Sequence, residues 1–217
     1  MKFFVSVLTT FAILLTSATA NAAKCKYEDD EVDKFTNVRT VQSKQKLLTS
    51  MMSAFGRAPK GPHAVYAGNV TAGFEGDDYF LEMRILVETY IPDKPPRYEL
   101  ENAIVVPEDS HLLILMADGN IERLPVSRAY SFNSEFVPPN GPGNSSKNDY
   151  WKSTEAHINY ALDEHMMTVL TSQDATNMRI EAGEDYYDIK IQKKSRGDMA
   201  EVIGCVQQAH ASEVPVK

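Results

Sequence analysis

The stretch most informative for the fold is LLILMADGNIERL, residues 112–124. Its two apolar runs, Leu112–Met116 and Ile121–Leu124, flank the dipeptide Asp118-Gly119. An Asp-Gly pair tolerates the positive φ angles of the tight turns that join antiparallel strands. These residues therefore predict a β-hairpin in the middle of the chain.

The strand pattern continues on both sides of this hairpin. Over residues 81–88 apolar residues alternate mainly with charged ones, which is typical of a strand with one buried and one solvated face. Residues 76–78, Gly-Asp-Asp, predict a turn between this strand and a strand at 63–74. Residues 183–184, Gly-Glu, predict a third hairpin. Most of the region 38–191 is thus expected to form strands.

Two helices are predicted in the last third of the chain. Asp163 can cap a short helix that ends near Leu170, and residues 195–198, Ser-Arg-Gly-Asp, resemble a capping box that starts a C-terminal helix. Many strands with few helices, and no regular strand–helix alternation, predict an α+β fold. This fold is a mostly antiparallel β-sheet built from hairpins, with a short helix after residue 162 and a C-terminal helix. The expected inner faces are Met166, Met167 and Leu170 in the short helix and Met199, Val202, Ile203 and Val206 in the C-terminal one.

The amino terminus carries the features of a secretory signal peptide. Lys2 precedes an apolar run over residues 3–15, and small residues follow that run. Cleavage after Ala22 would remove residues 1–22, and Ala20 offers an alternative site. The apolar run is shorter than the roughly 20 residues needed to span a bilayer. The chain is therefore expected to be exported, to the periplasm or to the medium.

Residues 23–217 are expected to form a single β-rich domain. Residues 138–149, PPNGPGNSSKND, predict a flexible loop within it, and a linker between two halves is the alternative. The formal net charge of −8 disfavours nucleic acid as a partner, because an acidic surface repels phosphates. No segment after the signal peptide is long and apolar enough to predict a membrane helix.

Cys25 and Cys205 are the only two cysteines, and they lie near the ends of the expected mature chain. In an oxidising compartment two such cysteines predict a disulfide, and two buried, unpaired thiols are the alternative. The sequence contains no Cys-x-x-Cys motif, which would indicate redox catalysis. The pair is therefore expected to tie both ends of the chain to the core.

Searches for catalytic and metal-binding patterns assign no residue. The histidines include no closely spaced pair, so neither a metal nor a cofactor is predicted, although His157 and His165 could converge in space. The acidic residues at 28–33 lack the Asp-x-Asp-x-Asp-Gly calcium loop and are interpreted as a solvated segment. Ser43 and Lys46 form a Ser-x-x-Lys pair without the other motifs of serine–lysine enzymes.

Aromatic residues gather on both sides of the 138–149 segment and form the candidate binding surface. Aromatics beside a loop can serve for recognition, and packing of the same residues into the core is the alternative. The substitution Trp151→Ala would distinguish these two interpretations. A large loss of thermal stability indicates that the ring packs in the core, whereas lost binding by a protein that still folds indicates a binding surface. The residues concerned are Tyr130, Phe132, Phe136, Tyr150 and Trp151.

The order of these features resembles that of an uncharacterised group of small exported bacterial proteins with no assigned activity. The shared features are an acidic start, DEVDKFT at residues 30–36, an Asp-Gly hairpin in mid-chain, and a strand–helix–hairpin–helix tail with a late cysteine. The resemblance implies a compartment and a fold type, and it supplies no catalytic residue.

Export, acidity, β-richness and the missing catalytic signatures together favour a non-catalytic domain that binds a protein or another envelope component. A hydrolase with a dispersed active site is the alternative, and a structural or stress-related envelope protein without a defined ligand is a third hypothesis. An enzyme requires a cleft in which histidines or carboxylates converge. A binding module requires an exposed apolar feature instead.

Overall fold

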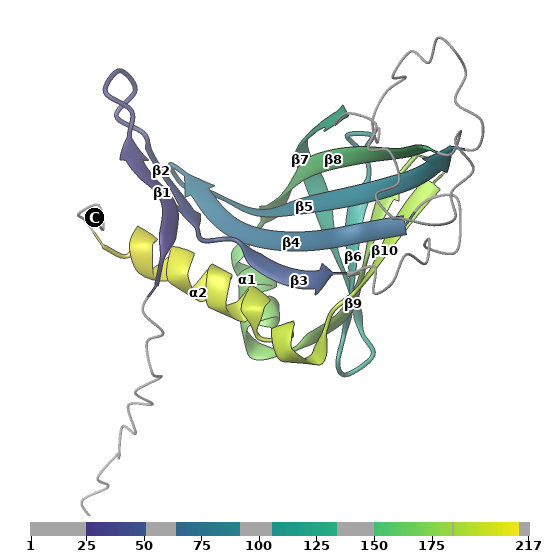
Figure 1. The fold of residues 1–217 in the computed structure, drawn as a ribbon. Coiled ribbons are helices and arrows are strands. Elements are labelled where there is room, and N and C mark those ends of the chain that lie inside the picture. Colours follow the sequence, from purple (N-terminus) through teal and green to yellow (C-terminus); the bar gives the residue numbers. More distant parts are fainter. Residues whose placement is uncertain (1–24, 51–63, 92–105, 134–149, 184, 213–217) are drawn as a thin grey trace, which may run out of the picture.

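The structure, a computed structural model, describes residues 25–50, 64–91, 106–133, 150–183 and 185–212. These residues form a ten-stranded antiparallel β-sheet and two α-helices (Figure 1). The α+β prediction is thereby confirmed, including the short helix after residue 162 and the C-terminal helix. The predicted signal peptide and the predicted loop lie outside the described residues.

The sheet is assembled mainly from strands that are neighbours in the sequence. From one edge to the other the order is β1-β2-β4-β5-β8-β7-β6-β9-β10, and β3 pairs with β4. β2 and β3 pair with successive parts of β4. The strands are β1 (Tyr27–Val32), β2 (Arg39–Ser43), β3 (Lys46–Ser50), β4 (Ala64–Glu75), β5 (Asp78–Ile91), β6 (His111–Met116), β7 (Ile121–Asn133), β8 (Tyr150–Leu162), β9 (Ala175–Ala182) and β10 (Asp185–Lys190).

All three predicted hairpins are present, as β4–β5, β6–β7 and β9–β10. Gly76 (φ 62°) lies in the first turn and Gly119 (φ 91°) in the second, and residues with a Cβ rarely adopt such angles. The local connections are therefore determined by turn chemistry. The longest pairing is non-local, because β5 and β8 are in register from Tyr79–Leu162 to Ile91–Tyr150.

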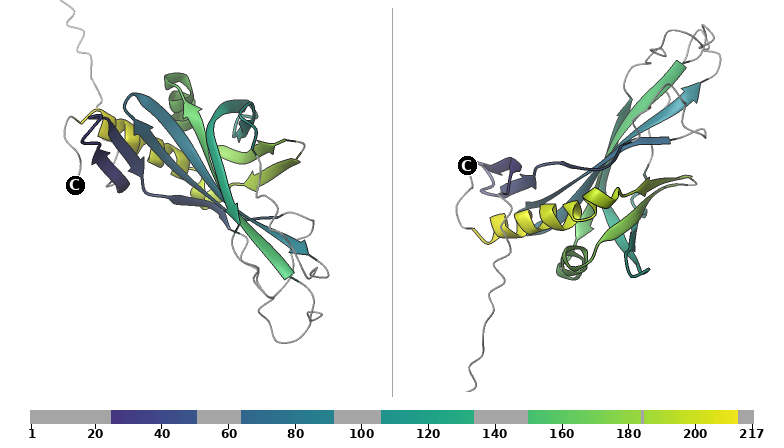
Figure 2. Two further views of the ribbon diagram at one scale, coloured as in Figure 1. Left: turned by 90° about the horizontal axis from the view of Figure 1, so that it is seen from above. Right: turned by 60° about the horizontal axis from the view of Figure 1, so that its bottom comes forward.

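The sheet is strongly twisted and curved, so that β10 approaches β3 and β4 (Figure 2). Just after β10, Gln192 donates its backbone N–H to the carbonyl oxygen of Leu48 in β3 at 3.0 Å. Gly68 of β4 permits this approach, since a Cβ there would lie 3.3 Å from Ile189 Cγ2. The apolar side chains of the strands meet inside this curve and form the core.

Helix α1 (Glu164–Ser172) packs on the apolar face of the sheet beside α2 (Asp198–His210) (Figure 1). The carboxylate of Asp163 accepts the Met166 N–H at 2.7 Å, which confirms the predicted N-cap. Met166, Met167 and Leu170 are buried, as their helical spacing predicts.

Helix α2 buries its predicted apolar face but does not begin with the predicted capping box. Its N-cap is Gly197, which has no side chain that could cap the helix. Ser195 lies in a 3-10 turn, η1 (Lys193–Ser195), and its hydroxyl donates to the Leu47 carbonyl oxygen at 2.9 Å. The capping-box prediction is wrong because this hydroxyl contacts β3 instead. The buried residues of the predicted face are Met199, Val202, Ile203 and Val206.

Two sets of contacts join the segment of β1 and β2 to α2 and the residues just after it. Cys25 and Cys205 lie at disulfide distance with their Cα atoms 5.4 Å apart, as the predicted pairing requires. Arg39 makes the second set, because its Nη1 donates to the carbonyl oxygens of Ala209 at 3.0 Å and Ser212 at 2.8 Å. Figure 1 shows β1 beside the carboxyl-terminal part of α2.

Tyr160 of β8 is a polar exception inside the apolar core. Its side chain is fully buried, and its hydroxyl has no hydrogen-bond partner among the described residues. Burial, together with the charge of Glu181, raises the pKa of Tyr160. A buried hydroxyl without a partner has lost its hydration without compensation, which destabilises the folded state.

Tyr160→Phe is therefore expected to raise the free energy of unfolding by about 1 kcal/mol, measured by urea denaturation. Tyr27→Phe is the matched control, because the Tyr27 hydroxyl donates to the Cys205 carbonyl oxygen at 3.1 Å. The control variant should lose about 1 kcal/mol. Changes of the same sign in the two variants would contradict the assignment.

Candidate functional site

A network of polar side chains lies on the face of the sheet opposite the core. Along β5, Leu81, Met83 and Ile85 are fully buried in the core. Glu82 and Arg84 alternate with them, and successive residues of a strand point to opposite faces. The second face of β5 therefore carries a carboxylate and a guanidinium, which are the centre of what we term the polar network.

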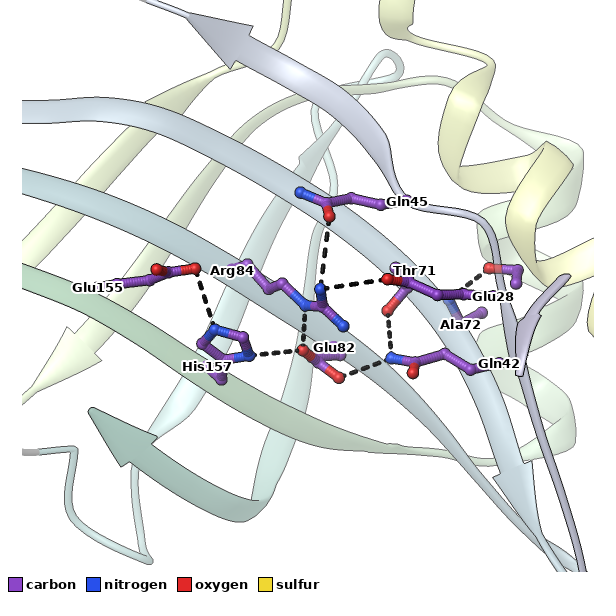
Figure 3. A network of polar contacts seen from close by, with 10 residues as sticks. Glu28, Gln42, Gln45, Thr71, Ala72, Glu82, Arg84, Glu155 and His157 are labelled. Carbon is purple, nitrogen blue, oxygen red and sulfur yellow. Dashed lines mark hydrogen bonds and ion pairs between the residues drawn. The ribbon is translucent and has the colours of Figure 1, made fainter. Parts of the chain in front are cut away.

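Glu82 is the central acceptor of the polar network (Figure 3). One carboxylate oxygen accepts from Arg84 Nε at 2.5 Å and lies 3.0 Å from His157 Nδ1. The other accepts from Gln42 Nε2 at 2.7 Å. The Glu82 side chain is only 7% exposed, so these partners replace most of the water that a carboxylate would otherwise bind.

The outer members of the network fix its ends. His157 Nε2 lies 3.1 Å from a carboxylate oxygen of Glu155, so each ring nitrogen faces a carboxylate. At the other end, Arg84 Nη1 donates to Gln45 Oε1 at 3.4 Å and lies 3.7 Å from the Glu28 carboxylate. The imidazole and the guanidinium are thus each held from two sides, as Figure 3 shows.

The contacts of Glu82 and Thr71 bear on the hydrolase alternative. A general base and a nucleophile must both be able to reach a substrate. Both oxygens of Glu82 already have close partners, and the hydroxyl of Thr71, which Gln42 contacts at 3.1 Å, is fully buried. These contacts favour a structural role for the polar network.

The described residues do not bring the two candidate histidines together. His157 belongs to the polar face of the sheet, whereas His165 is exposed on α1, which packs against the apolar face. Within the described ranges, no three His, Cys, Asp or Glu side chains are grouped so that they could hold a metal ion.

Register places two of the aromatic candidates beside the polar network. Tyr130 of β7 is paired with His157, and Phe132 is paired with Glu155. Residues directly opposite each other in an antiparallel pair occupy the same face of the sheet. Tyr130 and Phe132 therefore occupy positions on the face of the polar network.

The other three aromatic candidates are not all on that face. Trp151 is paired with Tyr90, and it lies four positions before Glu155 along β8, so both occupy the same face. Tyr150 falls on the opposite face by the same rule. Phe136 lies outside the described residues. The binding-surface hypothesis stays a prediction, with Tyr130, Phe132 and Trp151 on one face of the sheet.

The acidic segment at 28–33 is solvated only in part, because Glu28, Glu31 and Asp33 are exposed and Asp30 is not. Residues 27–32 form β1, which pairs with β2. Asp30 is nearly buried and forms a bidentate ion pair with Arg39 at 2.9 and 3.1 Å. The interpretation therefore fits Glu28, Glu31 and Asp33 and is wrong for Asp30, whose partner Arg39 lies across the β1–β2 hairpin.

The Ser-x-x-Lys pair does not form a catalytic contact. The Ser43 hydroxyl accepts the backbone N–H of Ala72 at 3.0 Å. The Lys46 ammonium instead contacts the carboxylate of Glu201 at 2.7 Å. The lysine is therefore directed to α2.

The turn between β1 and β2 presents a feature that the sequence interpretation missed. Phe35 is 98% exposed at this turn. Asp33 holds the turn, because one carboxylate oxygen accepts the backbone N–H groups of Phe35 and Thr36 at 2.7 Å each. The N–H groups of Thr36 and Phe35 lower the pKa of Asp33, so this carboxylate stays charged until the pH falls through that lowered value. Asp33 and Asn37, residues that favour turns, were the available signal.

Comparisons with known proteins add no relatives. No protein-family model matches the chain, and no curated protein or solved structure matches it either. None of the described helices is long and apolar enough to cross a membrane. The resemblance to small exported proteins therefore stays a prediction.

Proposed function

We propose that this chain is an exported, non-catalytic domain that binds a partner protein of the cell envelope through the β1–β2 hairpin. The observation that carries the proposal is Phe35, an almost fully exposed aromatic side chain in a turn with fixed hydrogen bonds. Burying such a side chain in a partner contributes about 2–3 kcal/mol. A pre-ordered turn also loses little conformational entropy on binding.

The charge of the hairpin favours a protein over a lipid surface as the partner. Phe35 follows β1, which carries the four acidic residues Glu28–Glu31, and at the turn Asp33 balances the one lysine there, Lys34. Anionic lipid headgroups would repel these carboxylates. An apolar pocket with a basic rim on a protein would accept both the ring and the charges. The signal-peptide pattern and the Cys25–Cys205 pair support an oxidising compartment as the site of this encounter.

Phe35→Ala is expected to weaken the partner complex by about 30-fold or more, the equivalent of burying a phenyl ring. Thermal stability should stay within about 0.5 kcal/mol of the parent protein, as for surface substitutions in general. A photo-crosslinking phenylalanine analogue at position 35, used in cells of the natural host, should give one discrete adduct whose partner mass spectrometry identifies. Affinity is then measured with that purified partner.

Tyr186 provides the matched control position. Its side chain is 58% exposed on β10, and its ring stacks under the Arg179 guanidinium at 4.0 Å. The same analogue at position 186 should give no discrete adduct. Equal adducts at both positions, or a Phe35→Ala protein that keeps its affinity, would refute the hairpin as the docking element.

A further inference from the structure

A second feature, separate from the hairpin tip, is a pocket of about 310 Å3 between α2 and the β2–β3 connection. Its walls come from the residue before β1, from residues 43–46 and from one side of α2. Pockets for small molecules occupy about 300–1,000 Å3, so this one has the size for a small ligand only.

The lining of this pocket has the opposite charge to the rest of the chain. Lys26, Lys44 and Lys46 line it, and Glu201 is the carboxylate among the lining residues. The whole chain carries a net charge of −8. A concentration of ammonium groups in a concave site attracts anions and raises their local concentration.

The positions of the lysines are fixed by the backbone and by the disulfide. The Lys44 N–H donates to the Lys26 carbonyl oxygen at 2.8 Å, which aligns the two residues at one end of the β1–β2 ladder. Cys25, next to Lys26, is joined to Cys205, which itself lines the pocket. The ammonium groups are therefore carried by a backbone that is already ordered before a ligand arrives, which favours binding.

Ser43 adds a buried polar group to the pocket. Its residue is 1% exposed, and its hydroxyl oxygen accepts the Ala72 N–H at 3.0 Å. A hydroxyl that accepts one hydrogen bond can still donate its own hydrogen. A hydrogen bond from a hydroxyl to an anionic oxygen is shorter and stronger than one to a neutral oxygen.

We propose that this pocket binds a small molecule with two or more anionic groups, through Lys26, Lys44 and Lys46 and the Ser43 hydroxyl. Glu201 competes with the ligand for Lys46, because its carboxylate lies 2.7 Å from the Lys46 ammonium. This competition limits the affinity. Phosphate and carboxylate oxygens fit this donor set equally well. Pyrophosphate and citrate are therefore the two probes that distinguish the chemical source of the anion.

The first test is calorimetric titration of the oxidised protein with each probe at low ionic strength, where screening is weak. Lys44→Gln should weaken binding of the preferred probe by about tenfold, the equivalent of one charge-assisted hydrogen bond. Lys194→Gln, an exposed lysine of η1 outside the pocket, removes the same charge and should change the affinity less than about twofold. Equal losses in the two variants would show non-specific attraction and overturn the proposal.

The second test removes the competing carboxylate. Glu201→Gln should tighten binding by about threefold, because it frees Lys46. Glu164→Gln, at an exposed position of α1 outside the pocket, should have no effect. A Kd above about 1 mM for both probes, or weaker binding by the Glu201→Gln protein, would overturn the proposal. Binding of one probe alone supports it and identifies the ligand as a phosphate or as a carboxylate.

Discussion

A protein without the Cys25–Cys205 disulfide, made as Cys25→Ala with Cys205→Ala, is expected to lose about 4 kcal/mol of unfolding free energy. The bond joins residues 180 positions apart, and the chain-entropy model gives on the order of 4–5 kcal/mol for loops of this length. Without the bond, the start of β1 is held to α2 by weaker contacts such as the Tyr27 hydrogen bond to Cys205. Urea denaturation of both proteins under oxidising conditions measures the difference.

A reductant supplies the control for this prediction. Dithiothreitol should lower the stability of the parent protein to that of the double variant and should leave the double variant unchanged. A loss below about 1 kcal/mol would mean that the bond does not restrict the unfolded chain as described. A reductant effect on the double variant would indicate an unrelated cause.

Glu82→Ala is expected to lower the free energy of unfolding by about 3 kcal/mol, the range for removing one partner of a buried charge pair. Arg84 and Gln42 would each lose an acceptor, at 2.5 and 2.7 Å respectively. Arg84 is 20% exposed, so some hydration can return, which places the loss at the lower end of that range. Thermal or urea denaturation at neutral pH measures it.

Glu155→Ala is the matched control, because both carboxylates contact the same imidazole. Glu155 lies 3.1 Å from His157 Nε2 but is 42% exposed, and exposed ion pairs contribute about 0–1 kcal/mol. The Glu155 variant should therefore lose far less than the Glu82 variant. Losses of equal size would show that burial does not determine the role of these carboxylates.

The hairpins could be predicted because their information is local. Asp118-Gly119 and the residues at 76–78 have the turn chemistry and the flanking alternation within one short stretch. β1 could not be predicted in the same way, since Glu28, Asp29 and Glu31 have low strand propensity. Its position depends on contacts such as Tyr27 with Cys205, which lie far apart in the sequence.

The candidate sites show the same limit. Alternation along β5 indicates that Glu82 and Arg84 share a face, but their partners Gln42 and His157 come from other strands. The register that joins these strands is set by the pairing of β2, β4, β5 and β8. The capping-box prediction failed for a related reason. The Ser195 hydroxyl donates to the Leu47 carbonyl oxygen of β3, a partner that is distant in the sequence.

Strand β1 ends one side of the sheet, so its outer backbone edge has no neighbour among the described strands. Free edges of this kind are templates on which a second copy can add its own strand and start aggregation. Four consecutive acidic residues, Glu28–Glu31, occupy this edge. Two copies that met there would bring like charges face to face, so the acidic composition of β1 opposes fibril-like association of the protein.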